Sequence, residues 1–243
     1  MKTFSETGHY KNVANFNALK VFAEGLGAEY NPQKDILKLP NLTTLLQAAT
    51  QLHNDVKEQA NTVALAVDER QLVFDDIKKL STRIINTMGS TDVSQKTIID
   101  AKAINAKIQG ARVKKKTETE EGKEDTKTTS VSRQSYDSFY ENFKALNNLL
   151  QQDGNYNPSE LDLNITGLTT KETEMLDANQ NITFQNNDLA NKRTLRNQKF
   201  YQGEDCLIEV AKGIKKYIRG KYGVSSAQFA QIKNLTFSNY ASK

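Results

Sequence analysis

The chain has few of the residues that crosslink a fold or interrupt its helices and strands. Its 243 residues include one cysteine, three prolines and no tryptophan. A single cysteine excludes an internal disulfide, and the scarcity of proline leaves long stretches that can form uninterrupted helices. Cys206 falls among the apolar positions of an expected helix, so we interpret it as a buried structural thiol and not a reactive one.

Long apolar runs are missing as well. No segment approaches the roughly 18 consecutive apolar residues of a membrane-spanning helix. The stretch from Met1 to His9 lacks the apolar run of a signal peptide. The sequence therefore predicts a cytoplasmic protein with no membrane span.

Residue patterns of catalysis are equally scarce. The two histidines, His9 and His53, lie far apart, and neither a His-Glu-x-x-His pattern nor a phosphate-binding Gly-x-x-x-x-Gly-Lys loop occurs. We interpret His53, with Asp55 and Glu58 nearby, as part of a helix surface and not as a metal site. The sequence predicts a protein that is not an enzyme and has no cofactor or metal.

Apolar residues at helical spacing are what the chain does contain. They recur every three or four positions over residues 42–67, 73–88 and 207–222, and Gly89 and Gly223 end the last two runs. Apolar residues make up 37% of the chain, which suits helices with narrow apolar stripes. We predict an all-α protein with the architecture of an up-down helical bundle.

The sequence also repeats itself. Several motifs of the first half return in the same order in the second, and from Tyr30 to Phe74 the offset is constant at 126 residues. The pattern predicts two pseudo-symmetric helical repeats, 1–110 and 136–243, each with about three main helices and one short helix. A Thr-, Ser-, Glu- and Lys-rich stretch at 111–135 is predicted to be a flexible charged linker. The matching motifs are Asn15–Leu19 with Asn142–Leu146, Tyr30–Pro32 with Tyr156–Pro158, Leu42–Thr44 with Leu168–Thr170, and Arg70 and Phe74 with Arg196 and Phe200.

Two Asn-Pro pairs predict helix starts. In Asn31-Pro32 and Asn157-Pro158, asparagine can cap free amides, and proline suits the first helical position because it has no N–H to leave unbonded. Together with the closing segment Lys215–Phe229 and the segment Ala103–Gly110, these pairs make the chain similar to uncharacterised two-repeat all-helical proteins of Bacteroidota-type bacteria. The resemblance covers most of the chain and implies a helical fold without implying an activity.

Charge is distributed unevenly along the chain. Residues 128–189 hold 3 basic and 9 acidic side chains, whereas residues 190–243 hold 11 basic and 3 acidic ones. One interpretation is that the basic C-terminal helix is neutralised by acidic helices of its own half. The alternative is a face that binds nucleic acid or another anionic surface. That candidate face consists of Lys212, Lys215, Lys216, Arg219 and Lys221.

Duplicated amphipathic helices without a catalytic pattern favour a structural or protein-interaction role. We therefore predict a non-enzymatic helical-bundle protein whose partner is another protein or a second copy of itself. Binding of nucleic acid or an anionic surface through the basic C-terminal helix is the alternative.

Overall fold

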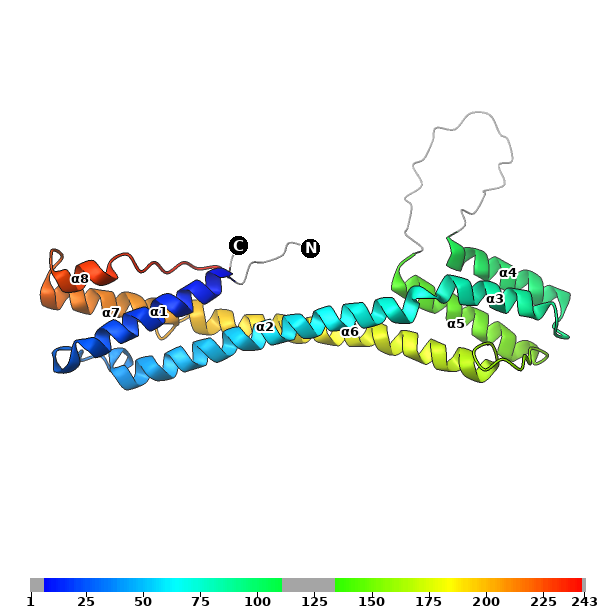
Figure 1. The fold of residues 1–243 in the computed structure, drawn as a ribbon, viewed down its shortest axis with the longest axis horizontal. Helices are drawn as coiled ribbons and strands as arrows, with labels where there is room; N and C mark the ends of the chain where they lie inside the picture. The colour runs from blue at the N-terminus through cyan, green and yellow to red at the C-terminus, as the bar shows by residue number, and fades with distance from the viewer. Residues whose placement is uncertain (1–6, 111–133, 242–243) are drawn as a thin grey trace, which may run out of the picture. The chain divides into compact units, whose positions relative to one another are not determined.

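The computed structural model describes residues 7–110 and 134–241 (Figure 1). Of these residues 78% are helical and none lies in a strand, which confirms the all-α prediction. None of the helices is both long enough and apolar enough to cross a membrane, in the portion of the chain covered here. The predicted linker 111–135 lies outside the described residues, apart from Gln134 and Ser135.

The chain folds into two compact units that cut across the predicted halves. Unit 1 comprises residues 1–64 and 185–243, and unit 2 comprises residues 65–184. Two 37-residue helices, α2 (Leu39–Asp75) and α6 (Ile165–Tyr201), each contribute one part to each unit. At about 1.5 Å per residue such a helix is longer than a small domain is wide, so it extends from one unit into the next. Each unit therefore combines helices from both halves.

Unit 1 is formed by the first part of α2, the last part of α6 and three further helices. These are α1 (Thr7–Gly25), α7 (Leu207–Tyr222) and α8 (Ala227–Ile232). Short 3₁₀ turns at Gly27–Glu29 and Asp35–Leu37 connect α1 to α2. One face of α1 packs on α7, and the shared core includes Phe16, Leu19, Leu42, Phe200, Leu207, Val210, Ile214 and Ile218.

Unit 2 is formed by the last part of α2, the first part of α6 and three other helices. These are α3 (Ile77–Met88), α4 (Gln95–Gln109) and α5 (Tyr136–Asp153). Helix α4 lies between α3 and α5 and packs on both. The core includes Phe74, Ile77, Leu80, Ile84, Met88, Phe143, Leu146, Leu150 and Leu168.

The prediction that the Asn-Pro pairs start the long helices is wrong. Helix α2 begins at Leu39, and Pro40, not Pro32, lies in its first turn. Burial in the cores is the reason, because Tyr30 and Leu37 are buried in unit 1 and Tyr156 and Leu163 in unit 2. Each of these segments therefore folds into turns on its core before the helix starts. The Tyr30 hydroxyl also donates a hydrogen bond to the carbonyl of Leu37 at 2.8 Å. Helix α6 likewise begins at Ile165, and the side-chain oxygen of the preceding Asn164 accepts a hydrogen bond from the amide of Gly167 in the first turn.

Other local signals are confirmed. Gly89 and Gly223 are the C-caps of α3 and α7. Gly223 has a φ of 87°, a left-handed backbone angle that costs a residue with a Cβ several tenths of a kcal/mol or more. Cys206 is 1% exposed and directly precedes α7, which agrees with a structural thiol.

Candidate interaction surfaces

The predicted basic residues of α7 divide into two groups. Three of them are bound by acceptors within unit 1. Lys212 forms an ion pair with Glu209 at 2.7 Å, and Lys221 forms one with Glu29 at 2.7 Å. Lys215 donates to the backbone carbonyls of Lys233 and Leu235 at 2.9 and 3.1 Å, and partial burial lowers its pKa.

Lys216 and Arg219 form the second group. Both are exposed, and neither has an ion-pair partner in the residues that the structure describes. Lys212, Lys216 and Arg219 follow one another at spacings of four and three, so they share one side of α7. The carboxylate that neutralises Lys212 is Glu209 of α7 itself, and the one that neutralises Lys221 is Glu29 of the first half of the chain. The acidic helices of the second half supply none of them.

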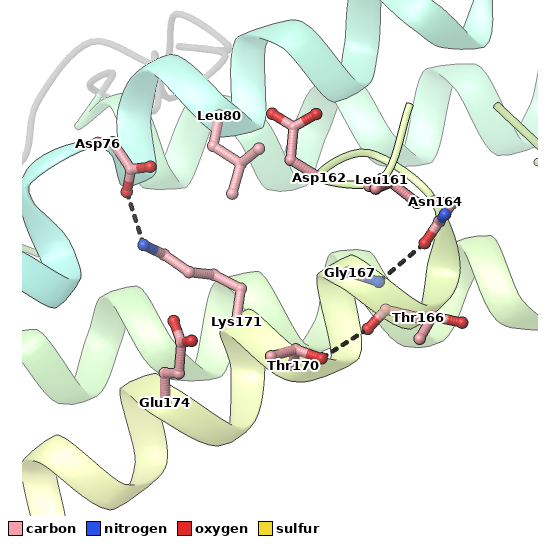
Figure 2. Close-up of a pocket in the computed structure, with 10 residues that line it drawn as sticks. All are labelled: Asp76, Leu80, Leu161, Asp162, Asn164, Thr166, Gly167, Thr170, Lys171 and Glu174. Carbon is pink, nitrogen blue, oxygen red and sulfur yellow. Dashed lines mark hydrogen bonds and ion pairs between the residues drawn. The ribbon is translucent and has the colours of Figure 1, made fainter. Parts of the chain in front are cut away.

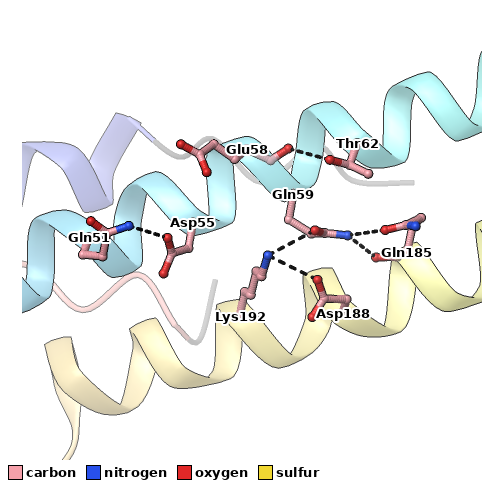
Figure 3. A network of polar contacts seen from close by, with 8 residues as sticks. All are labelled: Gln51, Asp55, Glu58, Gln59, Thr62, Gln185, Asp188 and Lys192. Carbon is pink, nitrogen blue, oxygen red and sulfur yellow. Dashed lines mark hydrogen bonds and ion pairs between the residues drawn. The ribbon is translucent and has the colours of Figure 1, made fainter.

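A polar contact joins α2 and α6 inside unit 1 (Figure 3). Gln59 is 5% exposed, and its amide Nε2 donates to the side-chain oxygen of Gln185 at 2.8 Å. The Oε1 atom of Gln59 accepts a hydrogen bond from Lys192 at 3.1 Å, and Lys192 is paired with Asp188 at 3.2 Å. The two charged side chains of this contact, Lys192 and Asp188, thus pair with each other. The sequence marks the contact only as a glutamine within the apolar stripe of α2, between Val56 and Val63.

His9 belongs to a second buried polar cluster of unit 1, which the sequence did not reveal. It is 4% exposed, and its Nδ1 lies 2.7 Å from the hydroxyl of Tyr201. Asn12 beside it donates to the carbonyl of Ser238 at 2.8 Å and accepts from the Ser238 amide at 3.2 Å. These bonds fasten the C-terminal segment to α1. Burial and, less strongly, the positive charge of Arg196 lower the pKa of His9 to about 4.

A shallow depression lies on unit 2 where α3, α6 and the loop before α6 meet (Figure 2). Lys171 bridges it with an ion pair to Asp76 at 2.8 Å, and Asp162 at its edge is held by Arg83. A Cβ on Gly167 would lie 2.0 Å from the carbonyl oxygen of Leu161, so only glycine allows this close crossing. Three of the charged lining groups are thus held in ion pairs, and Glu174 also lines the depression. The depression has the chemistry of a packed helix junction.

The outer face of α2 in unit 2 exposes two large apolar side chains. Leu65 is 69% exposed and Leu72 is 76% exposed. Asp68, Glu69 and Asp75 on the same part of α2 are exposed too. The sequence carries a signal for this pair, because Leu65 and Leu72 are seven residues apart and fall outside the apolar stripe that packs in the core.

The two units carry opposite net charge. Among the described residues, unit 1 has 15 basic and 9 acidic side chains, whereas unit 2 has 9 basic and 14 acidic ones. This separation follows the fold and not the sequence order, because unit 1 joins the near-neutral N-terminal segment to the basic C-terminal one. Unit 1 therefore attracts negatively charged surfaces, and unit 2 attracts positively charged ones.

No group of three or more metal-binding side chains gathers anywhere in residues 7–110 and 134–241. Comparison with known proteins gives no further guide: no family model, no curated protein and no solved structure matches this chain.

Proposed function

We propose that this protein is a non-enzymatic helical scaffold that works by binding protein surfaces through exposed helix faces. The observation that carries the proposal is the pair Leu65 and Leu72, 69% and 76% exposed on one helix and surrounded by carboxylates. Apolar groups that are gathered on a surface and rimmed by polar residues are typical of sites of protein contact.

We further propose that the scaffold is built from two repeats, each of which contributes to both units. Helices α2 and α6 support this, because both have 37 residues and their bounds differ by the same 126 positions. The buried residues correspond as well. Phe16, Leu19, Tyr30, Leu42 and Phe74 of the first half match Phe143, Leu146, Tyr156, Leu168 and Phe200 of the second, and all ten are buried.

The third helices extend the correspondence. Ile77, Leu80, Ile84 and Met88 of α3 match Leu207, Val210, Ile214 and Ile218 of α7 at an offset of 130. Unit 1 therefore joins the beginning of the first repeat to the end of the second, and unit 2 joins the remaining parts. This exchange of parts is the arrangement of a domain-swapped dimer, here within one chain.

The Gln59–Gln185 hydrogen bond supports the same idea. The two glutamines are 126 residues apart, so each is the equivalent of the other in the two repeats. We infer that the two repeats contact each other along α2 and α6 through equivalent residues within unit 1.

Position-specific crosslinking tests the proposed function. A photo-reactive amino acid at position 72 of the full chain, activated in its native cells, is expected to yield covalent adducts with protein. The matched control places the same group at Gln198, the exposed equivalent of Leu72 on α6. Adducts at 72 that are absent at 198 support a protein-binding face. Adducts with nucleic acid alone, or no adducts from 72, would contradict the proposal.

Binding to nucleic acid is the alternative, and it is favoured by Lys216 and Arg219, which are exposed and have no ion-pair partner among the described residues. Its test is fluorescence anisotropy with labelled DNA and RNA at increasing salt, comparing the parent with K216E/R219E. Binding through this face would weaken steeply with salt, because neutralised phosphates release counterions. If the parent bound at micromolar concentration and the folded variant did not, the alternative would become the leading function. We expect no such binding. Lys215 is left unchanged because its bonds to residues 233 and 235 hold the C-terminal segment.

A further inference from the structure

Two surfaces of this chain are complementary in charge. The acidic strip comprises Leu65, Asp68, Glu69, Leu72 and Asp75 on α2 in unit 2. The basic strip comprises Lys212, Lys216, Arg219 and Gly220 on α7 in unit 1. We propose that the acidic strip of one copy binds the basic strip of a second copy. This inference rests on the proposed function and names the partner.

Helical spacing arranges the acidic strip for such a contact. Leu65 and Leu72 are separated by two turns, or about 10 Å along the helix, and so lie on the same side. Asp68 and Asp75 follow the leucines by three positions, whereas Glu69 follows Leu65 by four. Positions three and four away fall on either side of the leucine, so carboxylates flank the apolar line on both edges.

In the part of the chain that the structure describes, the strip's carboxylates are left without ion pairs. Asp68, Glu69 and Asp75 form no ion pair in the described residues, while the neighbouring Asp76 is bound by Lys171 at 2.8 Å. Carboxylates that border an apolar line and lack a partner favour a cationic surface with apolar parts.

The fold does not require leucine at these places. The equivalents of Leu65 and Leu72 on α6 are Asn191 and Gln198, which are exposed in unit 1. The equivalent exposed helix positions are therefore occupied by polar amides in one repeat and by leucines in the other. The acidic residues are equally particular to unit 2, since the equivalents of Asp68, Glu69 and Asp75 are Thr194, Leu195 and Tyr201. The difference points to a contact that only this part of α2 makes.

The basic strip offers the complementary chemistry. Lys216 and Arg219 are exposed and form no ion pair with the described residues. Their aliphatic stems can cover a leucine while their charged ends reach carboxylates. Gly220 lies within α7, where glycine is less favourable than alanine because it loses more backbone freedom. A Cβ added there would have no neighbour within 4 Å, so packing inside the chain does not explain this glycine. Its missing side chain leaves the α7 backbone open to an approaching leucine.

The opposite net charges of the two units make a second copy the fitting partner. The contact joins different surfaces, so a bound pair still presents a free basic strip on one copy and a free acidic strip on the other. Association is therefore expected to continue beyond two copies unless the arrangement closes into a ring. It should also weaken as salt rises, because the pairs lie at the surface.

Sedimentation velocity of the full chain at low salt tests the proposal through charge exchange. The parent is expected to associate with increasing concentration. D68K/E69K makes both strips basic and K216E/R219E makes both acidic, so each variant alone should associate at least tenfold more weakly. An equimolar mixture should associate again, because each variant then meets opposite charge on both strips.

Two controls separate the strip from net charge and from folding. D100K/E141K replaces two exposed carboxylates of unit 2 that lie outside the strip. It changes the net charge by the same amount as D68K/E69K, and association should persist. L65N/L72Q installs the residues that the second repeat carries, so the helix content should stay and association should fall.

A parent that remains monomeric at every concentration at low salt would overturn the second copy as partner. So would a mixture of the two charge variants that fails to associate. If crosslinks from position 72 then join only other proteins, the proposed function stands and only the self-association is wrong.

Discussion

Cutting the chain between its halves is expected to leave the two fragments bound together. A site-specific protease sequence inserted within residues 114–130 of the full chain would separate the first half from the second. Each unit needs both fragments, since α1 packs on α7 in unit 1 and α4 packs on α5 in unit 2. The nicked protein should therefore elute and sediment with the mass of the intact chain and come apart only in denaturant.

The strength of this association follows from the cores. Fully burying one large apolar side chain contributes about 1.5–3 kcal/mol, and each fragment supplies several to both units. Association costs about 4–15 kcal/mol in lost translational and rotational freedom and more in ordering, which leaves a submicromolar dissociation constant as the expected result. Elution as two separate folded fragments would show that the halves are independent domains and would contradict the units described above.

A matched pair of substitutions on α1 sharpens the test. Phe16→Ala removes a fully buried ring from the core of unit 1 and should weaken the nicked complex by about 3–5 kcal/mol. Val21→Ala, on the same helix but 54% exposed, should leave it unchanged. Equal effects of the two changes would mean that α1 does not hold the fragments together through this core.

Stability is expected to fall as pH drops from about 6.5 towards 4, because His9 is buried as the neutral imidazole. Its pKa is lowered to about 4 by burial and then by the charges of Arg196, His53 and Arg193. The unfolded chain takes up a proton on this residue near pH 6.5, whereas the folded chain does so only near pH 4. Between these values the unfolded state binds more protons, so acidification favours unfolding.

The size of the effect follows from the difference in pKa. At 1.36 kcal/mol per pH unit, the lost free energy of unfolding approaches about 3 kcal/mol by pH 4. Urea denaturation at several pH values, for the parent and for His9→Asn, measures it. Protonation of carboxylates with lowered pKa, such as Asp162 beside Arg83, also lowers the free energy of unfolding in acid, but it does so equally in the parent and the variant. Parallel pH curves for parent and variant would show that His9 does not titrate as described.

The sequence by itself determined the class of fold and many helix ends. Apolar spacing of three and four with only three prolines leaves helices as the means of burying those residues. Serines before α4 and α8 accept from the third amide of each helix at 3.1 Å, a local bond that needs no tertiary partner. The basic side of α7 was also visible, because charge spacing on one helix is a local property.

Only the tertiary structure decided which helices pack together. An apolar stripe has no direction of its own, so the stripe of α1 fits α3 or α7 equally well as far as pattern goes. The length of α2 and α6 brings α1 to α7 and α5 to α4, and repeats of similar sequence cannot specify that choice locally. The start of α2 likewise depends on the burial of Tyr30 and Leu37 in the core of unit 1, which no local pattern encodes.

The candidate surfaces depend on the same decision. The separation of charge into a basic and an acidic unit appears only when the N- and C-terminal segments are joined. The burial of His9 requires Tyr201, which lies 192 residues away in the chain. The sequence shows that positions 65 and 72 are leucines, but their exposure depends on which side of α2 the packed helices cover. Burial is a property of the assembled core, and for this reason the sequence gives the residues of a surface without revealing that they form one.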